Sequence, residues 1–159
     1  MRIDRIEQIM EMCEEHLSSL SAYGTEIESL LTQAILVIMY SEFEKKIKGL
    51  VQKKCSSIED SSIKEFFGSC VNAMFRSIKS TEMAGLLNRF GPSHKGAFQQ
   101  KTHDHQRAET FYNNIVTNRH WVAHSEGSQA TFREAKQFYE EGHVVLDFFQ
   151  QALLERDSA

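Results

Sequence analysis

One apolar stretch decides the fold: residues 34–40 read AILVIMY. Because nearly every position in it is apolar, a helix through it would be buried over most of its circumference instead of along one stripe. From Ile27 to Val51 the surrounding apolar residues recur at intervals of three and four, which is the period of one helix face. The pattern predicts a long helix over about residues 25–54 that packs on two sides and forms the centre of the protein.

The rest of the chain shows the same helical spacing. It contains one proline and 8 glycines, and its apolar residues recur mostly three or four positions apart, which favours helices over a β-sandwich or a βαβ repeat. We therefore expect an all-α, up-and-down helical bundle with additional short helices. Beyond the central helix, the pattern predicts helices at about residues 2–20, 63–78, 80–90, 104–124 and 131–153.

Three local features add detail to this layout. A glutamate follows three positions after Thr25 and again after Thr131, and both pairs predict capping boxes at helix starts. Bulky aromatics such as Phe66 are expected in the core or in a dimer interface. Residues 93–104 predict a long polar loop, locally basic through Lys95 and Lys101, and long loops are often functional or mobile.

Length and composition limit what the protein can be. A chain of 159 residues is most economically one domain, residues 1–159, with a single core. A net charge of −4 gives no global positive field, so any contact with nucleic acid has to be local. The three cysteines are an odd number and lie far apart, which favours free thiols in a reducing compartment over disulfides or a zinc site.

The sequence also predicts a cytoplasmic protein without membrane contact. The N-terminus carries charges at Arg2, Asp4 and Arg5, where a signal peptide would need an apolar run. The longest apolar run, residues 34–40, is far shorter than the roughly 20 residues that span a bilayer.

The candidate site lies in residues 118–127, which read NRHWVAHSEG. An arginine followed by a histidine five positions later occurs twice in this chain, as Arg119–His124 and as Arg89–His94, so this spacing alone is weak evidence. Between Arg89 and His94 lies a Gly-Pro break, and nothing there holds the pair in place. After Arg119 come the polar His120, three residues of apolar character and a small polar turn.

That succession resembles the signature of the HEPN superfamily, in which an arginine precedes a polar residue and, four positions after that, a histidine. The long central helix, the Glu-x-Glu-Lys-Lys run at residues 42–46 and the helix after the motif resemble the RiboL-PSP-HEPN family in particular. The resemblance covers about residues 25–153. It implies a HEPN-like bundle in which Arg119, His120 and His124 form the catalytic site.

The resemblance further implies a metal-independent endoribonuclease that acts as a toxin or a defence effector. A ribose 2′-hydroxyl that attacks its adjacent phosphate needs a proton acceptor, a proton donor and positive charge beside the transition state. Histidine and arginine supply these without a metal or any other cofactor. By resemblance we expect a homodimer with the active site at its interface, and Asn118, Lys95 and Lys101 are candidate RNA-binding residues.

On an ideal helix Arg119 and His124 point about 140° apart, so they converge only if the helix ends or loosens between them. Two other interpretations stay open. His120 and His124 stand four apart and could hold a metal with His143, Glu126 or a histidine from residues 93–105, although the His-Glu-x-x-His pattern is missing. Alternatively, the chain is a non-catalytic HEPN-like interaction module that binds an antitoxin or another protein of a defence complex.

Overall fold

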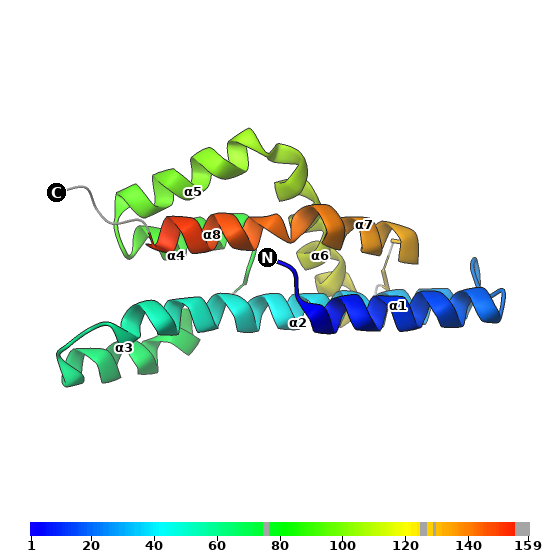
Figure 1. Ribbon diagram of the computed structural model, residues 1–159, viewed down its shortest axis with the longest axis horizontal. Helices are drawn as coiled ribbons and strands as arrows, with labels where there is room; N and C mark the ends of the chain where they lie inside the picture. Colours follow the sequence, from blue (N-terminus) through cyan, green and yellow to red (C-terminus); the bar gives the residue numbers. More distant parts are fainter. Residues whose placement is uncertain (75–76, 125–126, 129, 155–159) are drawn as a thin grey trace.

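The computed structural model describes residues 1–74, 77–124, 127–128 and 130–154, without the side chains of residues 71–74. Over these residues the chain is helical and contains no strand, which confirms the all-α prediction (Figure 1). The helices are α1 (Asp4–Ser19), α2 (Glu26–Ser56), α3 (Ser61–Met74), α4 (Ser80–Asn88), α5 (Pro92–Asp104), α6 (Gln106–Ala123), α7 (Phe132–Gly142) and α8 (Val144–Leu154).

Helix α2 is the centre of the bundle, as the apolar stretch predicts. With 31 residues it is the longest helix described, and it packs against α1, α3, α6, α7 and α8. Figure 1 shows α1 and α3 running beside α2, with α7 and α8 lying above it and α5 on their outer side. The residues that α2 buries are Thr32, Ile35, Leu36, Met39, Phe43, Ile47, Val51 and Cys55. Val37 is 41% exposed, so the packing does not close around the whole helix.

An aromatic stack joins α2 to α6 and α7. The fully buried Phe43 ring lies parallel to the Tyr112 ring, with centroids 5.6 Å apart and an interplanar angle of 2°. On another side it contacts the Tyr139 ring, at 6.2 Å between centroids. The Tyr112 hydroxyl donates a hydrogen bond of 2.8 Å to the Ile78 carbonyl, and burial raises the pKa of this hydroxyl well above its ordinary value.

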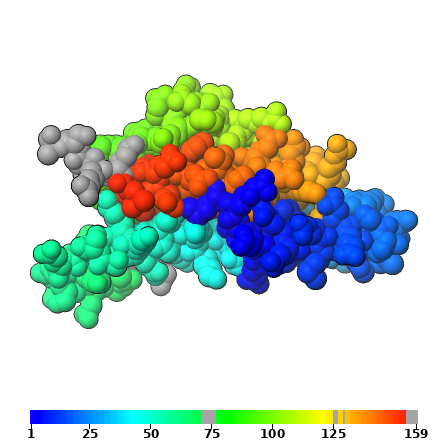
Figure 2. Space-filling model, in the orientation of Figure 1, coloured from blue at the N-terminus to red at the C-terminus, as the bar shows by residue number. Residues whose placement is uncertain are grey.

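The N-terminal residues are fastened across the bundle. The Ile3 N–H donates to the Tyr139 hydroxyl at 2.7 Å, and the amino group of Met1 forms an ion pair with Asp147 of α8. Figure 2 shows this segment, in dark blue, lying against the orange and red surface of α7 and α8. The first residues therefore close one end of the space between α2 and α8.

The prediction of a polar loop at residues 93–104 is wrong, because these residues form α5. Pro92 occupies the start of the helix, where a missing N–H costs nothing and the fixed φ favours helix. The buried face consists of His94, Phe98 and Thr102, spaced four apart. Two of these three residues are polar, so the hydropathy pattern conceals the stripe. His94 has its Nδ1 atom 2.7 Å from the Ala152 carbonyl oxygen, which satisfies the buried ring.

The predicted last helix is two helices, α7 and α8, with the break at His143. Gly142 ends α7 against the backbone of α6: a Cβ atom at this position would lie 2.6 Å from the Tyr112 nitrogen. Helix α7 and helix α6 therefore pack closer at this point than any side chain allows.

The two predicted capping boxes differ in outcome. The box at the start of α7 is confirmed, with reciprocal hydrogen bonds between Thr131 and Glu134. At the start of α2 the Thr25 side chain makes no capping bond. Glu28 instead accepts hydrogen bonds from the Gly24 N–H at 2.6 Å and from the Phe132 N–H at 3.0 Å. That carboxylate ties the start of α2 to the start of α7.

Helix α3 is less buried than the core prediction requires. It packs along α2, but Phe66 is 64% exposed and Ile63 is 48% exposed, while Phe67 is half-buried. The later apolar residues of the predicted helix over residues 63–78, Val71, Met74 and Phe75, lie outside the described side chains. The aromatics of α3 are therefore mainly at the surface, and a role in a dimer interface stays a prediction.

The structure bears on the predictions for the cysteines and for a membrane span. Cys13, Cys55 and Cys70 are free thiols, and burial raises the pKa of the Cys13 and Cys55 thiols. Among the described helices, none combines the length and the hydropathy that crossing a bilayer requires.

Replacing Gly142 with alanine tests the close contact of α6 and α7. We expect Gly142→Ala to lower the free energy of unfolding by about 1–3 kcal/mol, because the new methyl group overlaps backbone atoms that cannot rotate away. The matched control is Gly96→Ala in α5, where a Cβ meets nothing within 4 Å. This substitution should raise the free energy of unfolding by about 0.5–1 kcal/mol. Urea unfolding measures both, and equal stability of the two variants contradicts the assigned contact.

Candidate functional site

The motif lies at the C-terminal end of α6. The helix is unbroken through Ala123, and His124 is its C-cap, with its N–H 3.1 Å from the carbonyl oxygens of His120 and Trp121. The loosening that would bring Arg119 and His124 together is therefore absent within the described helix. No hydrogen bond or ring contact joins these two side chains in the described part of the chain. Ser125 and Glu126, which we expected in the following turn, lie outside the described residues.

His120 has a contact with His124 and a pocket in common with Arg119. Its ring centroid is 4.3 Å from that of His124, with 57° between the ring planes, and both histidines are exposed. On its other side His120 lines the same pocket as Arg119. His120 is therefore the residue that both contacts the His124 ring and shares a pocket with Arg119.

Arg119 is held in place by an aromatic ring of α2. Its guanidinium carbon lies 4.6 Å from the centroid of the Tyr40 ring, a distance at which a cation is attracted to the ring face. Among the described residues no carboxylate forms an ion pair with Arg119. Burial, followed by Glu44, raises the pKa of the Tyr40 hydroxyl, and Arg119 opposes this. The half-buried guanidinium is therefore oriented without being neutralised.

These residues open onto a pocket of about 320 Å³ between α2, α4 and α6. It offers a second cation, Lys79, and one carboxylate, Glu82. Sequence reasoning missed both, as well as Tyr40, because their proximity to Arg119 depends on how distant helices pack. The lining residues are Tyr40, Ser77, Lys79, Glu82, Val116, Arg119 and His120.

The structure places the other predicted residues elsewhere. Asn118 is 6% exposed, and its amide donates to the Asn114 carbonyl at 2.9 Å while its Oδ1 accepts from the Ser128 hydroxyl at 3.1 Å. The bond from Ser128 joins the segment after α6 to the helix. Lys95 and Lys101 are half-buried on α5, and neither lines the Arg119 pocket. None of these three residues lines the Arg119 pocket, and RNA binding by them stays a prediction.

The described residues near the motif offer few ligands for a metal ion. Among the described residues, no group of three or more histidine, cysteine, aspartate or glutamate side chains could hold an ion. His143 lies at the junction of α7 and α8, with its ring beside Tyr139. Glu126, another candidate third ligand, is outside the described residues. His120 and His124 therefore stand as a pair of imidazoles.

Comparison of the chain with protein-family models, with curated proteins and with solved structures gives no match. The resemblance to the HEPN superfamily consequently depends on the motif at Arg119–His124 and on the helix pattern around it.

Replacing Asn118 separates a packing residue from its exposed neighbours. We expect Asn118→Ala to lower the free energy of unfolding by about 1–3 kcal/mol, because two hydrogen bonds are lost, one to the Asn114 carbonyl and one from the Ser128 hydroxyl. His124→Ala, at an exposed position, should change it by no more than about 0.5 kcal/mol. Urea unfolding of both variants measures the difference, and an Asn118→Ala protein as stable as His124→Ala contradicts the packing role.

Proposed function

We propose that this protein is a metal-independent endoribonuclease of the HEPN type. The single observation that carries the proposal is the placement of Arg119, partly exposed and without a carboxylate partner among the described residues, beside His120 on one open pocket. The His124 ring adds a second imidazole 4.3 Å from the first. Phosphate recognition and proton transfer are thereby available at one helix end.

Each side chain has a role that its chemistry suits. Arg119 binds the scissile phosphate, since its planar fork of N–H donors matches phosphate oxygens and stays charged at every relevant pH. Of the two histidines, one accepts the proton of the 2′-hydroxyl and the other donates a proton to the leaving 5′-oxygen. The products are a 2′,3′-cyclic phosphate and a free 5′-hydroxyl. Tyr40 is a positioning residue that keeps the guanidinium pointed at the pocket.

The helix geometry favours a site that two chains share. Arg119 and His124 are separated by an unbroken helical segment, so they project in different directions, about 140° apart. A second copy related by a two-fold axis would bring its own motif against the first. Such a dimer supplies the Arg119 of one chain and the His124 of the other to the same phosphate.

A second candidate function is supported by the surface of α3. Phe66 and Ile63, three positions apart on one side of the helix, are exposed there, and contiguous exposed apolar surface is a feature of contact sites for other proteins. In this alternative the chain is a non-catalytic module that binds an antitoxin or a defence-complex protein. Its complex with that partner would survive Arg119→Ala and His124→Ala unchanged.

Cleavage of total RNA in EDTA tests the ribonuclease proposal. We expect the wild-type chain to cut RNA and leave cyclic phosphate ends, and Arg119→Ala and His124→Ala each to slow cleavage by about 10²–10⁴-fold, the range for loss of a proton-transfer or charge-stabilising group. His16→Ala, an exposed histidine on α1, is the control and should keep full activity. Absence of cleavage, or cleavage unaffected by His124→Ala, refutes the proposal.

Mixing two inactive variants tests the shared site. When Arg119→Ala and His124→Ala chains are combined in equal amounts, half of the dimers are mixed and each mixed dimer holds one complete site. We therefore expect about a quarter of wild-type activity to return. Sedimentation at several concentrations reports the dimer itself. A mixture that stays inactive although mixed dimers form shows that each chain builds its own site.

A further inference from the structure

Glu82 lines the Arg119 pocket but has no part in the proposed cleavage chemistry. It lies in the first turn of α4, is exposed, and shares the pocket with the cations Arg119 and Lys79. Within the part of the chain that the structure describes, its carboxylate forms no ion pair with either of them. A bare carboxylate repels a bound phosphate, so its presence in the pocket favours a ligand that also carries hydrogen-bond donors.

The start of α4 does not use Glu82 as a cap. A glutamate at the third position of a helix can accept a hydrogen bond from the N–H of the residue before the helix, as Glu134 does from Thr131 in α7. At α4 the corresponding N–H, that of Lys79, donates instead to the Ser77 hydroxyl at 3.2 Å. The carboxylate of Glu82 is therefore available to a ligand.

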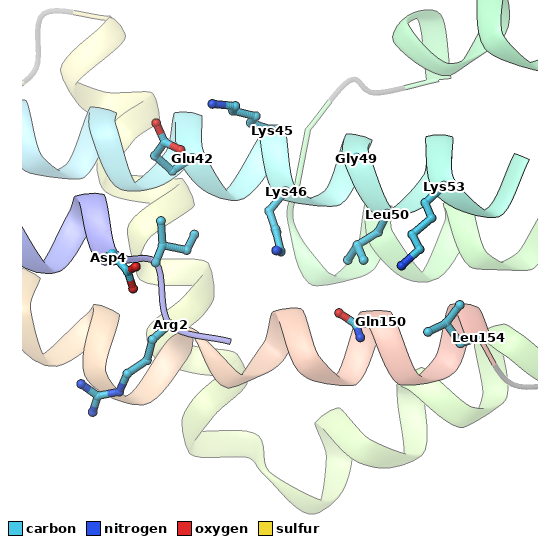
Figure 3. Close-up of a pocket in the computed structure, with 11 residues that line it drawn as sticks. Arg2, Asp4, Glu42, Lys45, Lys46, Gly49, Leu50, Lys53, Gln150 and Leu154 are labelled. Atoms are coloured by element: carbon cyan, nitrogen blue, oxygen red, sulfur yellow. The ribbon is translucent and has the colours of Figure 1, made fainter. Parts of the chain in front are cut away.

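The carboxylate of Glu42 shows the contrasting case. Glu42 lines the hollow between α2 and α8 together with Lys45 and Lys46 (Figure 3). It bonds to Arg5 of α1, so a side chain of the protein itself balances its charge. In the Arg119 pocket, the described residues leave the charge of Glu82 without such a partner.

Helix α4 carries Glu82 in a fixed position relative to α6. The buried Ser80 donates from its N–H to Asn113 Oδ1 at 3.1 Å and from its hydroxyl to the Glu109 carboxylate at 2.6 Å. The Asn113 amide donates back to Ser80 Oγ at 2.9 Å. Because Arg119 belongs to the same helix as Asn113 and Glu109, these bonds position the helix of Glu82 relative to Arg119. Groups on rigid helices discriminate between ligands more sharply than groups on loops.

The pocket has the size and the surface for one base of an RNA strand. Its volume of about 320 Å³ lies at the lower end of the roughly 300–1,000 Å³ of sites that hold small molecules. Val116 and Tyr40 supply apolar and aromatic surface. Proteins bind the bases of single-stranded RNA against such surfaces and form hydrogen bonds with their Watson–Crick edges.

We propose that Glu82 selects guanine as the base next to the scissile phosphate, an inference that rests on the proposed ribonuclease function. A carboxylate presents two acceptor oxygens side by side and no donor. Guanine presents two donors side by side, N1–H and the N2 amino group, so one base satisfies both oxygens. Arg119 on the phosphate and Glu82 on the base then hold one nucleotide at two points.

The other bases match this carboxylate less well. Adenine and cytosine each place a ring nitrogen acceptor beside their single amino group, and uracil places its N–H between two carbonyl groups. In each case one oxygen of Glu82 faces an acceptor, which repels it, and loses the water that it binds in the free protein.

Binding of RNA that cannot be cut tests the selection separately from cleavage. The probes are 2′-O-methyl oligouridines, unchanged or with one central guanosine, inosine or adenosine, and fluorescence anisotropy reports their binding to the full chain. Without a free 2′-hydroxyl the proposed cleavage cannot occur, so affinity alone is measured. We expect guanosine to bind about tenfold more tightly than inosine, which lacks the N2 amino group, and adenosine to bind more weakly still.

Glu82→Gln removes the charge and one acceptor while keeping the size of the side chain. The preference for guanosine over adenosine should fall to within about twofold, and unchanged oligouridine should bind at least as tightly as to the wild type, because a negative charge is gone. A merely structural role would instead weaken all probes alike. The matched control is Glu65→Gln on α3, exposed and outside the Arg119 pocket, which should keep the full preference.

The base selection and the ribonuclease proposal can fail separately. Equal affinity for the guanosine and adenosine probes, an unchanged preference in Glu82→Gln, or no binding of any probe at millimolar concentration overturns the selection. A guanosine preference that depends on Glu82 in a chain that does not cut RNA supports the selection and refutes the ribonuclease. In a chain that does cut, sequenced ends from total RNA should be enriched in guanosine on one side of the cut. Ends without this enrichment overturn the selection and leave the ribonuclease intact.

Discussion

The arrangement of the bundle depends on the constraints that meet at Tyr112. Its ring stacks on Phe43 of α2, and its hydroxyl donates a hydrogen bond to the Ile78 carbonyl before α4. Its backbone nitrogen lies where α7 approaches most closely, at Gly142. Three neighbours of α6 are therefore fixed by one buried residue. Burial of a hydroxyl is tolerated because it has an acceptor, and the ring adds aromatic contact to the apolar area that it removes from water.

The same contact sets the geometry of the candidate site. Tyr40 lies about one turn before Phe43 on α2, and Arg119 lies about two turns after Tyr112 on α6, so both project from the faces that the aromatic stack joins. The Tyr40–Arg119 contact of 4.6 Å follows from this crossing. A cation on a rigid helix, held by a ring on a second rigid helix, is more precisely placed than one on a loop.

The sequence predicts the fold well where the spacing of apolar residues reflects burial. It fails where contacts between distant helices determine the structure. It predicts α2 and the capping box at Thr131, since both are local patterns. It misses α5, whose buried face uses His94 and Thr102, and the break at His143, next to the glycine that the backbone of another helix requires. At the candidate site it proposes Arg119, His120 and His124, which stay a prediction, and it does not point to Tyr40 or Lys79, which only the packing of α2, α4 and α6 brings near Arg119.

Acidity and size together constrain how the proposed ribonuclease would hold RNA. With a net charge of −4 and with Arg119 and Lys79 as the cations of the pocket, a single chain can neutralise few phosphates. Each phosphate contact contributes to affinity and to its salt dependence, so one chain alone would bind weakly. Pairing two chains doubles the local cations without raising the charge of either surface elsewhere. The shared site that we propose would therefore solve an electrostatic problem as well as the geometric one posed by the unbroken end of α6.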